Sequence, residues 1–246
     1  MRTTVLILGG TTEARELAEL LVDEPDTRIV TSYAGRTASP RTPPGDIRTG
    51  GFGGPDGLRE WLTAHAPAIL VDATHPFAQT ISASAAAVPE VPRLRLVRPG
   101  WTEQAGDRWH RVPTLDAAAA ALPAHGDRAF VTTGRQRLDA FTALGLPLLL
   151  VRCVEPPGGS LPPNVRLLLD RGPYTVESER ALLDRNGIDV VVAKDSGGDA
   201  TRAKLDAARE RGIPVILVDR PIQPAVPTVD TPAAAAARVR ELLSAP

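Results

Sequence analysis

Cysteine is almost absent from this sequence, because Cys153 is the single one among 246 residues. One thiol can form neither an intramolecular disulfide nor a multi-cysteine metal site. The four histidines, His65, His75, His110 and His125, show no metal-ligand spacing, so no metal is expected. No apolar run is long enough to span a bilayer, and the chain enters its first expected strand without a signal peptide. We therefore expect a cytoplasmic protein with no membrane partner.

Several common motifs are also missing, and each excludes a class of function. The chain has no G-x-x-x-x-G-K-[ST] phosphate loop and no G-x-S-x-G nucleophile elbow. Short-chain dehydrogenases need a tyrosine with a lysine four residues later, but Tyr33 is followed at that spacing by Thr37 and Tyr174 by Ser178. The formal net charge is −1 at pH 7, which gives no electrostatic reason to expect a nucleic-acid partner.

Apolar strand-like segments alternate with amphipathic helix-like segments along the chain. Strands are predicted at residues 5–8, 28–33, 69–72, 94–97, 129–132, 148–152, 190–193 and 215–218. Helices are predicted at residues 13–22, 55–65, 77–88, 115–122, 137–144, 176–186, 201–211 and 232–243. This alternation predicts an α/β fold with parallel sheets. A polar, turn-rich stretch at 101–109 interrupts it, so we predict two Rossmann-like domains, 1–100 and 101–246, with an inter-domain cleft.

The stretch ILGGTTEAREL (residues 7–17) places two glycines between a strand and a helix. Gly9 and Gly10 allow a tight turn, and the unpaired N–H groups at the start of the helix attract anions. The residues that would form a dinucleotide turn are Gly9, Gly10, Thr11, Thr12 and Glu13. The alternative is an ordinary helix cap by a threonine, because the motif lacks the full G-x-G-x-x-G pattern.

The second predicted strand ends in SYAGRT (residues 32–37), which contains no acidic residue. An acid at this place holds the ribose hydroxyls of NAD, whereas a nearby arginine accommodates the 2′-phosphate of NADP. Arg36 and Thr37 are therefore predicted to meet a 2′-phosphate. The alternative for Arg36 is a solvated loop arginine.

The third predicted strand runs into DATHPFA (residues 72–78), at the same edge of the expected sheet. We expect Ala73, Thr74, His75 and Pro76 to line the ribose or nicotinamide side of the cofactor. His75 could also donate a proton, or it could simply cap the next helix.

The second half of the chain repeats this arrangement in three loops that precede predicted helices, two of which directly follow predicted strands. Basic residues and hydroxyls beside helix starts suit a ligand with several carboxylates or phosphates. Ordinary capping and solvated charges are the alternative for each residue. The residues predicted to bind substrate are Thr133, Gly134, Arg135, Gln136, Arg171, Tyr174, Lys194, Asp195 and Ser196.

Taken together, LGGTTEAREL, YAGR, DATHPFA, TTGRQ, GPY and AKDSGG resemble the motifs of the precorrin-6A reductase family of the cobalamin (vitamin B12) pathway, in order and spacing across residues 8–198. The resemblance implies two Rossmann-like domains, which can exchange a strand, with NADPH bound at the cleft. It also implies reduction of one carbon–carbon double bond of the precorrin-6A macrocycle, giving precorrin-6B. The acetate and propionate groups of this tetrapyrrole would account for the basic loops.

The residues leave several alternatives open. The proton source could be His75, Tyr174, Lys194, Asp195 or water. The substrate could carry cobalt or lack it, and the oligomeric state is open, with a monomer favoured. Two competing hypotheses are a non-catalytic NADP-binding sensor and an NADP-dependent enzyme that acts on a nucleotide-sugar.

Overall fold

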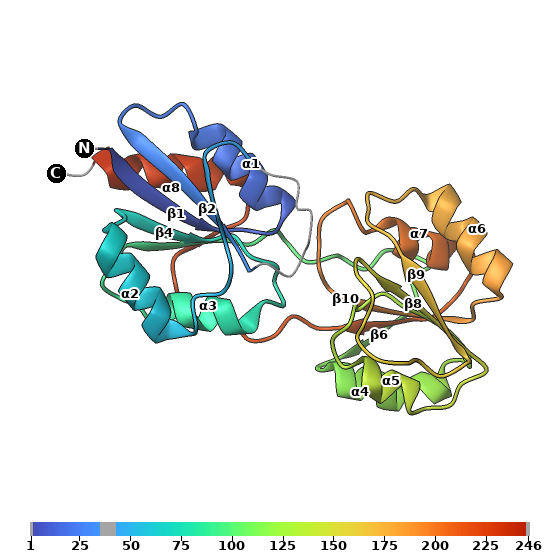
Figure 1. Cartoon of the computed structure of the whole chain (residues 1–246). Helices are drawn as coiled ribbons and strands as arrows, with labels where there is room; N and C mark the ends of the chain where they lie inside the picture. The colour runs from blue at the N-terminus through green and yellow to red at the C-terminus, as the bar shows by residue number, and fades with distance from the viewer. Residues whose placement is uncertain (1, 35–42, 245–246) are drawn as a thin grey trace. The chain divides into compact units, whose positions relative to one another are not determined.

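The computed structural model describes residues 2–34 and 43–244 and divides into two compact units (Figure 1). Unit 1 comprises Met1–Pro99 and Pro221–Pro246, and unit 2 comprises Gly100–Arg220. Each unit contains one six-stranded sheet in which every pairing is parallel. The predicted fold class, two α/β units with parallel sheets, is confirmed. Within the described ranges, no helix is both long and apolar enough to cross a membrane.

The sheet of unit 1 has the strand order β12-β5-β4-β1-β2-β3, in which β1 is central. Its strands are β1 (Thr3–Leu8), β2 (Thr27–Tyr33), β3 (Asp46–Thr49), β4 (Ile69–Asp72), β5 (Arg93–Leu96) and β12 (Thr228–Val229). One face is covered by α1 (Thr12–Leu21) and α8 (Pro232–Ser244), and the other by α2 (Pro55–His65) and α3 (Gln79–Ala86) (Figure 1). This is the doubly wound arrangement that binds dinucleotides in many α/β proteins.

Alternation along the central strand produces the two cores of unit 1. Val5 and Ile7 belong to the apolar cluster under α1 and α8, whereas Leu6 and Leu8 belong to the cluster on the opposite face. All four side chains are at most 2% exposed, as expected for a parallel strand that is buried on both faces.

The sheet of unit 2 has the order β6-β11-β10-β7-β8-β9. Its strands are β6 (Trp109–Val112), β7 (Arg128–Val131), β8 (Leu148–Cys153), β9 (Val165–Leu169), β10 (Val190–Lys194) and β11 (Val215–Val218). One face carries α6 (Val176–Asn186) and α7 (Ala203–Glu210), and the other carries α4 (Leu115–Ala121) and α5 (Leu138–Thr142), with the short 3-10 helix Leu122–Ala124 after α4. Unit 2 is therefore doubly wound as well.

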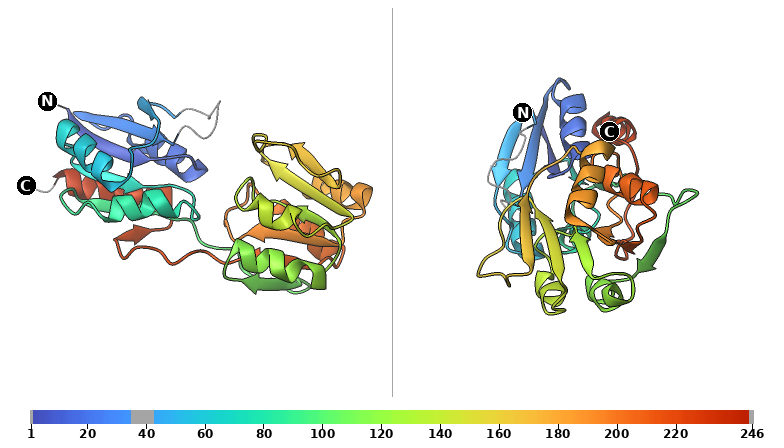
Figure 2. Two further views of the ribbon diagram at one scale, coloured as in Figure 1. Left: turned by 60° about the horizontal axis from the view of Figure 1, so that its bottom comes forward. Right: turned by 90° about the vertical axis from the view of Figure 1, so that its right-hand side faces the viewer.

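Each unit obtains its sixth strand by exchange. The strand that follows β5 in the chain, β6, pairs with β11 of unit 2, and the strand that follows β11, β12, pairs with β5 of unit 1. Figure 2 shows β12 and α8, in the colours of the end of the chain, among the blue and green elements of unit 1. The predicted second domain, 101–246, is thus corrected, because residues 221–246 belong with unit 1. The physical reason is that β12 pairs with the otherwise free edge of β5, and α8 packs against α1.

Candidate functional site

The loops at the carboxyl ends of β1 and β4 are tied together in unit 1. Thr11 Oγ1 donates a hydrogen bond to the carbonyl oxygen of Ala73 (2.7 Å) and accepts one from the N–H of Ala14 (3.1 Å). The N–H of Gly9 donates to the carbonyl of Ser32 at the end of β2 (2.9 Å). Three neighbouring strand ends are therefore linked at the point where the strand order reverses, which is where doubly wound sheets bind ligands.

The β1–α1 loop has the shape that a pyrophosphate needs. A Cβ added to Gly9 would lie 2.8 Å from the Thr31 side chain, so no larger residue fits there. Gly10 has a φ of +114°, and a Cβ on it would meet nothing within 4 Å, so the backbone is open to an approaching group. Thr12 begins α1, whose first N–H groups favour an anion. The residues present fit a dinucleotide at this place.

Glu13 lies in the first turn of α1, where its charge would oppose a bound anion. Its carboxylate is paired with Arg98 Nη1 at 2.6 Å, and both side chains are largely buried, 17% and 16% exposed. Arg98 therefore offsets the negative charge beside the helix start. The sequence reasoning missed Arg98, although its place directly after an apolar strand was a usable signal.

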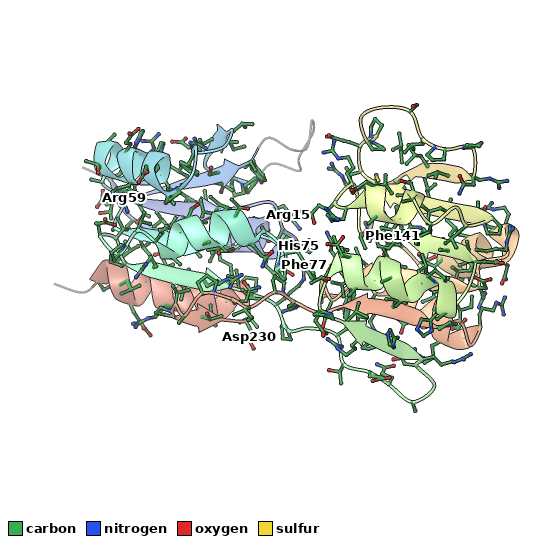
Figure 3. All side chains as sticks on the ribbon, turned by 90° about the horizontal axis from the view of Figure 1, so that it is seen from below. Arg15, Arg59, His75, Phe77, Phe141 and Asp230 are labelled. Carbon is green, nitrogen blue, oxygen red and sulfur yellow. The ribbon has the colours of Figure 1, made fainter. Side chains whose placement is uncertain are left out.

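The segment after β4 directs its polar groups both inward and toward its own backbone. The Thr74 hydroxyl donates to Asp72 Oδ1 (2.6 Å) and lies 3.3 Å from Ser82 Oγ, so it is used inside the unit. His75 Nδ1 accepts from the N–H of Phe77 (3.2 Å), which places the hydrogen of the neutral ring on Nε2. Figure 3 labels His75 and Phe77 close together, and their ring centroids are 5.8 Å apart. Only His75 among these residues keeps a titratable group near the loop surface.

Two further contacts define this segment. The Pro76 carbonyl accepts a hydrogen bond from Gln223 Nε2 (3.0 Å), which joins the loop to the returning chain of unit 1. Asp72 Oδ2 lies 3.4 Å from Nε of the buried Arg95 on β5. The predicted 2′-phosphate residues, Arg36 and Thr37, lie outside the described residues.

In unit 2, a hydrogen bond joins the loop after β7 to the last residue of β10. Lys194 Nζ donates to Gln136 Oε1 at 2.5 Å, and burial lowers the pKa of Lys194 to about 8. Arg135 turns toward the loop after β8, with Nη2 3.6 Å from Glu155. The Thr133 hydroxyl is buried and has no hydrogen-bond partner within the described part of the chain, and Gly134 has a φ of +73°. Of the predicted catalytic residues in unit 2, Lys194 is the one whose pKa is lowered.

Asp195 and Ser196 are engaged in holding unit 2 together. Asp195 Oδ1 accepts from the N–H of Trp101 (2.9 Å) and Oδ2 pairs with Arg111 (2.7 Å), and the residue is 4% exposed. The carbonyls of Asp195 and Ser196 accept from Arg220 (2.9 and 3.1 Å). The structure therefore gives the Asp195 carboxylate an anchoring role at the first residues of unit 2.

Tyr174 lies between β9 and α6, on a buried ion pair that sequence reasoning missed. Arg152 stacks over the Tyr174 ring at 3.9 Å and donates two hydrogen bonds to Glu179 (2.7 and 3.1 Å). Burial raises the pKa of Tyr174, which makes its hydroxyl a weaker acid. The exposed Arg171 lies in the same loop. A usable signal was Arg152 itself, a charged residue within the apolar strand LLLVRC.

The other candidate reactive groups are the single cysteine and the potential metal ligands. Cys153 is buried, and burial raises the pKa of its thiol, so it is not an activated nucleophile. Among the described residues, no group of three or more potential ligands could hold a metal ion.

The fold and the linked β1 and β4 loops define an α/β protein whose first unit is a doubly wound, Rossmann-like sheet. The family model "Precorrin-6x reductase CbiJ/CobK" matches residues 4–240. The chain therefore belongs to the precorrin-6x reductase family, whose reductases use a nicotinamide cofactor.

Individual relatives agree with this assignment. The chain is 49% identical over 244 residues to a protein of Rhodococcus erythropolis named Precorrin-6A reductase, covering 98% of each chain. It is 29% identical over 237 residues to a Cobalt-precorrin-6A reductase of Priestia megaterium, covering 88% and 90% of the two chains. A solved structure described as CobK precorrin-6A reductase superposes with a TM-score of 0.90 at 45% identity, covering 98% of this chain and 97% of that one.

Proposed function

We propose that this chain reduces one carbon–carbon double bond of precorrin-6A with a hydride from NADPH, giving precorrin-6B in cobalamin biosynthesis. The observation that carries this function is the 49% identity to a precorrin-6A reductase over 98% of both chains. The relative named for the cobalt-bearing substrate is 29% identical, so the cobalt-free macrocycle is the substrate we favour.

The cofactor assignment rests on the loops of unit 1. We assign the N–H groups of residues 9–13 to the pyrophosphate, Arg36 and Thr37 to the 2′-phosphate, and residues 73–76 to the ribose or nicotinamide side. When bound, NADPH supplies the hydride, while the protein supplies orientation and electrostatics.

The substrate assignment rests on the cationic loops of unit 2. Arg135 and Arg171 follow β7 and β9, and Lys194 is the last residue of β10, so all three lie at the same edge of one parallel sheet. Guanidinium and ammonium groups bind carboxylates through charge-assisted hydrogen bonds, and the acetate and propionate arms of the macrocycle present several carboxylates.

The proton that accompanies the hydride is assigned to Lys194. At neutral pH its ammonium group still carries the proton, because its pKa is about 8. Tyr174 is a weaker acid than usual, and the Asp195 oxygens are already bound by Trp101 and Arg111. His75, which belongs to unit 1, remains the alternative donor.

The proposal is tested by titrating the purified protein with NADPH and NADH and then adding cobalt-free precorrin-6A while NADPH absorbance is followed. Preferential NADPH binding with substrate-dependent oxidation would support the reductase. Oxidation of NADPH only in the presence of cobalt-precorrin-6A would show that the substrate carries cobalt. Tight NADPH binding without turnover on either macrocycle would favour the non-catalytic sensor.

Arg36→Ala is expected to weaken NADPH binding by about 1.5–3 kcal/mol, the usual loss for a hydrogen bond to a charged group. NADH lacks the 2′-phosphate, so its affinity should change little. The measurement is the dissociation constant of each cofactor by fluorescence titration. An equal loss for both cofactors would contradict the 2′-phosphate assignment.

Arg98→Ala is expected to weaken binding of NADPH and NADH alike, by about 0.5–1.5 kcal/mol, because the Glu13 charge is then left beside the pyrophosphate. The double variant Arg98→Ala/Glu13→Gln should recover most of this loss, since the unpaired charge is gone. If the double variant binds no better than Arg98→Ala, Arg98 does not act by neutralising Glu13.

A further inference from the structure

The loop that follows β3 in unit 1 has the sequence GGFGG, residues 50–54, and presents bare backbone. A Cβ added to any of its four glycines would meet nothing within 4 Å. Three of them, Gly50, Gly53 and Gly54, have φ values between +83° and +118°. The glycines therefore keep open space in front of the loop, which we call the glycine loop.

Arg48 at the end of β3 fixes the glycine loop to β2. Its Nη1 donates to Ser32 Oγ (3.1 Å) and to the Gly50 carbonyl (2.5 Å), and its Nη2 donates to the Gly51 carbonyl (2.9 Å). The guanidinium also lies over the Phe52 ring, 3.7 Å from its centroid. One side chain thus holds the backbone carbonyls of Gly50 and Gly51 in place.

The loop is also seated firmly on α2. Phe52 packs edge-on against Trp61 of α2, with centroids 6.0 Å apart. A Cβ on Gly57 would fall 1.8 Å from the Phe52 carbonyl oxygen, so the loop touches the first turn of α2 where only glycine fits. A loop with four glycines that is held at both ends is a preformed wall rather than a flexible linker.

The position of the glycine loop in the sheet indicates which ligand it contacts. In register, Ser32 of β2 pairs with Arg48 of β3, so the glycine loop stands beside the carboxyl end of β2. In doubly wound sheets that strand end holds the ribose of the adenosine half of a dinucleotide. The open space in front of the glycine backbone allows the flat face of a base to approach closely.

We propose that the glycine loop, held by Arg48 as a positioning residue, forms the wall that binds the adenosine half of the dinucleotide cofactor. This inference rests on the proposed function, because it needs a dinucleotide in unit 1. It adds a site that sequence reasoning assigned to no ligand.

The first test is Arg48→Ala, with dissociation constants measured for NADPH, NADH and reduced nicotinamide mononucleotide. Both dinucleotides should bind about 10–100-fold more weakly, and by the same factor, since they share adenosine and a lost stacking surface costs about that much. The mononucleotide should bind as to the wild type, and in turnover KM for NADPH should rise while kcat is kept. Arg59→Ala is the matched control, because Arg59 on α2 also makes several bonds, to Asp56, Glu90 and Ala87.

The second test keeps the idea falsifiable if Arg48→Ala does not fold. Gly51 has an ordinary φ and open space, so Gly51→Leu should leave Tm unchanged while its side chain fills the space proposed for adenosine. Dinucleotide affinity should fall in the order wild type, Gly51→Ala, Gly51→Leu. Unchanged affinity in a folded Gly51→Leu would overturn the inference and leave the proposed function standing. A wild-type protein that binds neither dinucleotide would overturn both.

Discussion

Glu179→Ala is expected to lower the free energy of unfolding of unit 2 by about 3–5 kcal/mol. The Glu179 carboxylate is 1% exposed and accepts two hydrogen bonds from Arg152, which is 7% exposed. Removing the carboxylate leaves a buried guanidinium without its partner, and desolvation of that charge is no longer offset. Lys204, whose pKa burial lowers to about 7, also loses the favourable effect of the Glu179 charge.

The measurement is urea unfolding followed by tryptophan fluorescence, with Asp184→Ala as the matched control. Asp184 pairs with Arg211 at 2.5 Å, but both side chains are about half exposed, 50% and 41%. An exposed pair is screened by solvent and contributes little, so this variant should be nearly as stable as the wild type. A loss for Glu179→Ala no larger than that of Asp184→Ala would show that the buried pair is not important for stability.

The central strands of both sheets could be predicted from the sequence because they are buried on both faces. Leu148–Cys153 and Ile69–Asp72, for example, are buried at every position and form continuous apolar runs with one charged residue each. Helix starts were also readable, as at Thr231, whose hydroxyl accepts from the N–H of Ala234. Burial on two faces leaves a strong pattern in a single sequence.

The edge strands could not be predicted in the same way. Asp46–Thr49, Trp109–Val112, Val165–Leu169 and Thr228–Val229 each have a neighbour on one side only and include exposed residues. Their pairing depends on which free edge is available in space. Sequence spacing therefore placed β12 and α8 wrongly, because it assigned residues 221–246 to the second domain.

The candidate site, too, could be predicted from the sequence only in part. The rule that ligands bind at the carboxyl ends of parallel strands located the loops after β1, β4, β7 and β10. The rule could not tell which polar groups are used internally. Thr74 turns to Asp72, two residues before it, and Asp195 turns to Trp101 and Arg111, which lie 94 and 84 residues away in the chain. The burial of Arg95 could not be predicted either, because it depends on the neighbours of β5 in the sheet.

Lys194→Met is expected to lower kcat for precorrin-6A reduction by about 100- to 10,000-fold, the usual contribution of a positioned proton donor. The chain has two lysines, Lys194 and Lys204, against 26 arginines, and an arginine cannot release its proton at neutral pH. Lys194→Arg is therefore the matched variant: it keeps the positive charge and should stay slow if proton donation matters. If Lys194→Arg restores kcat, Lys194 acts by charge alone.

The pH dependence gives an independent check on Lys194. Burial lowers its pKa from 10.5 to about 8, so the ammonium group is present below pH 8 and is lost as pH rises through that value. Wild-type kcat should then fall above about pH 8, while the residual rate of Lys194→Met should stay flat there. For stability the sign is opposite: between pH 8 and 10.5 the unfolded chain binds more protons than the folded one, so folding stability rises with pH. A wild-type rate that is flat through pH 8, together with that rise in stability, would place Lys194 in the fold rather than in proton transfer.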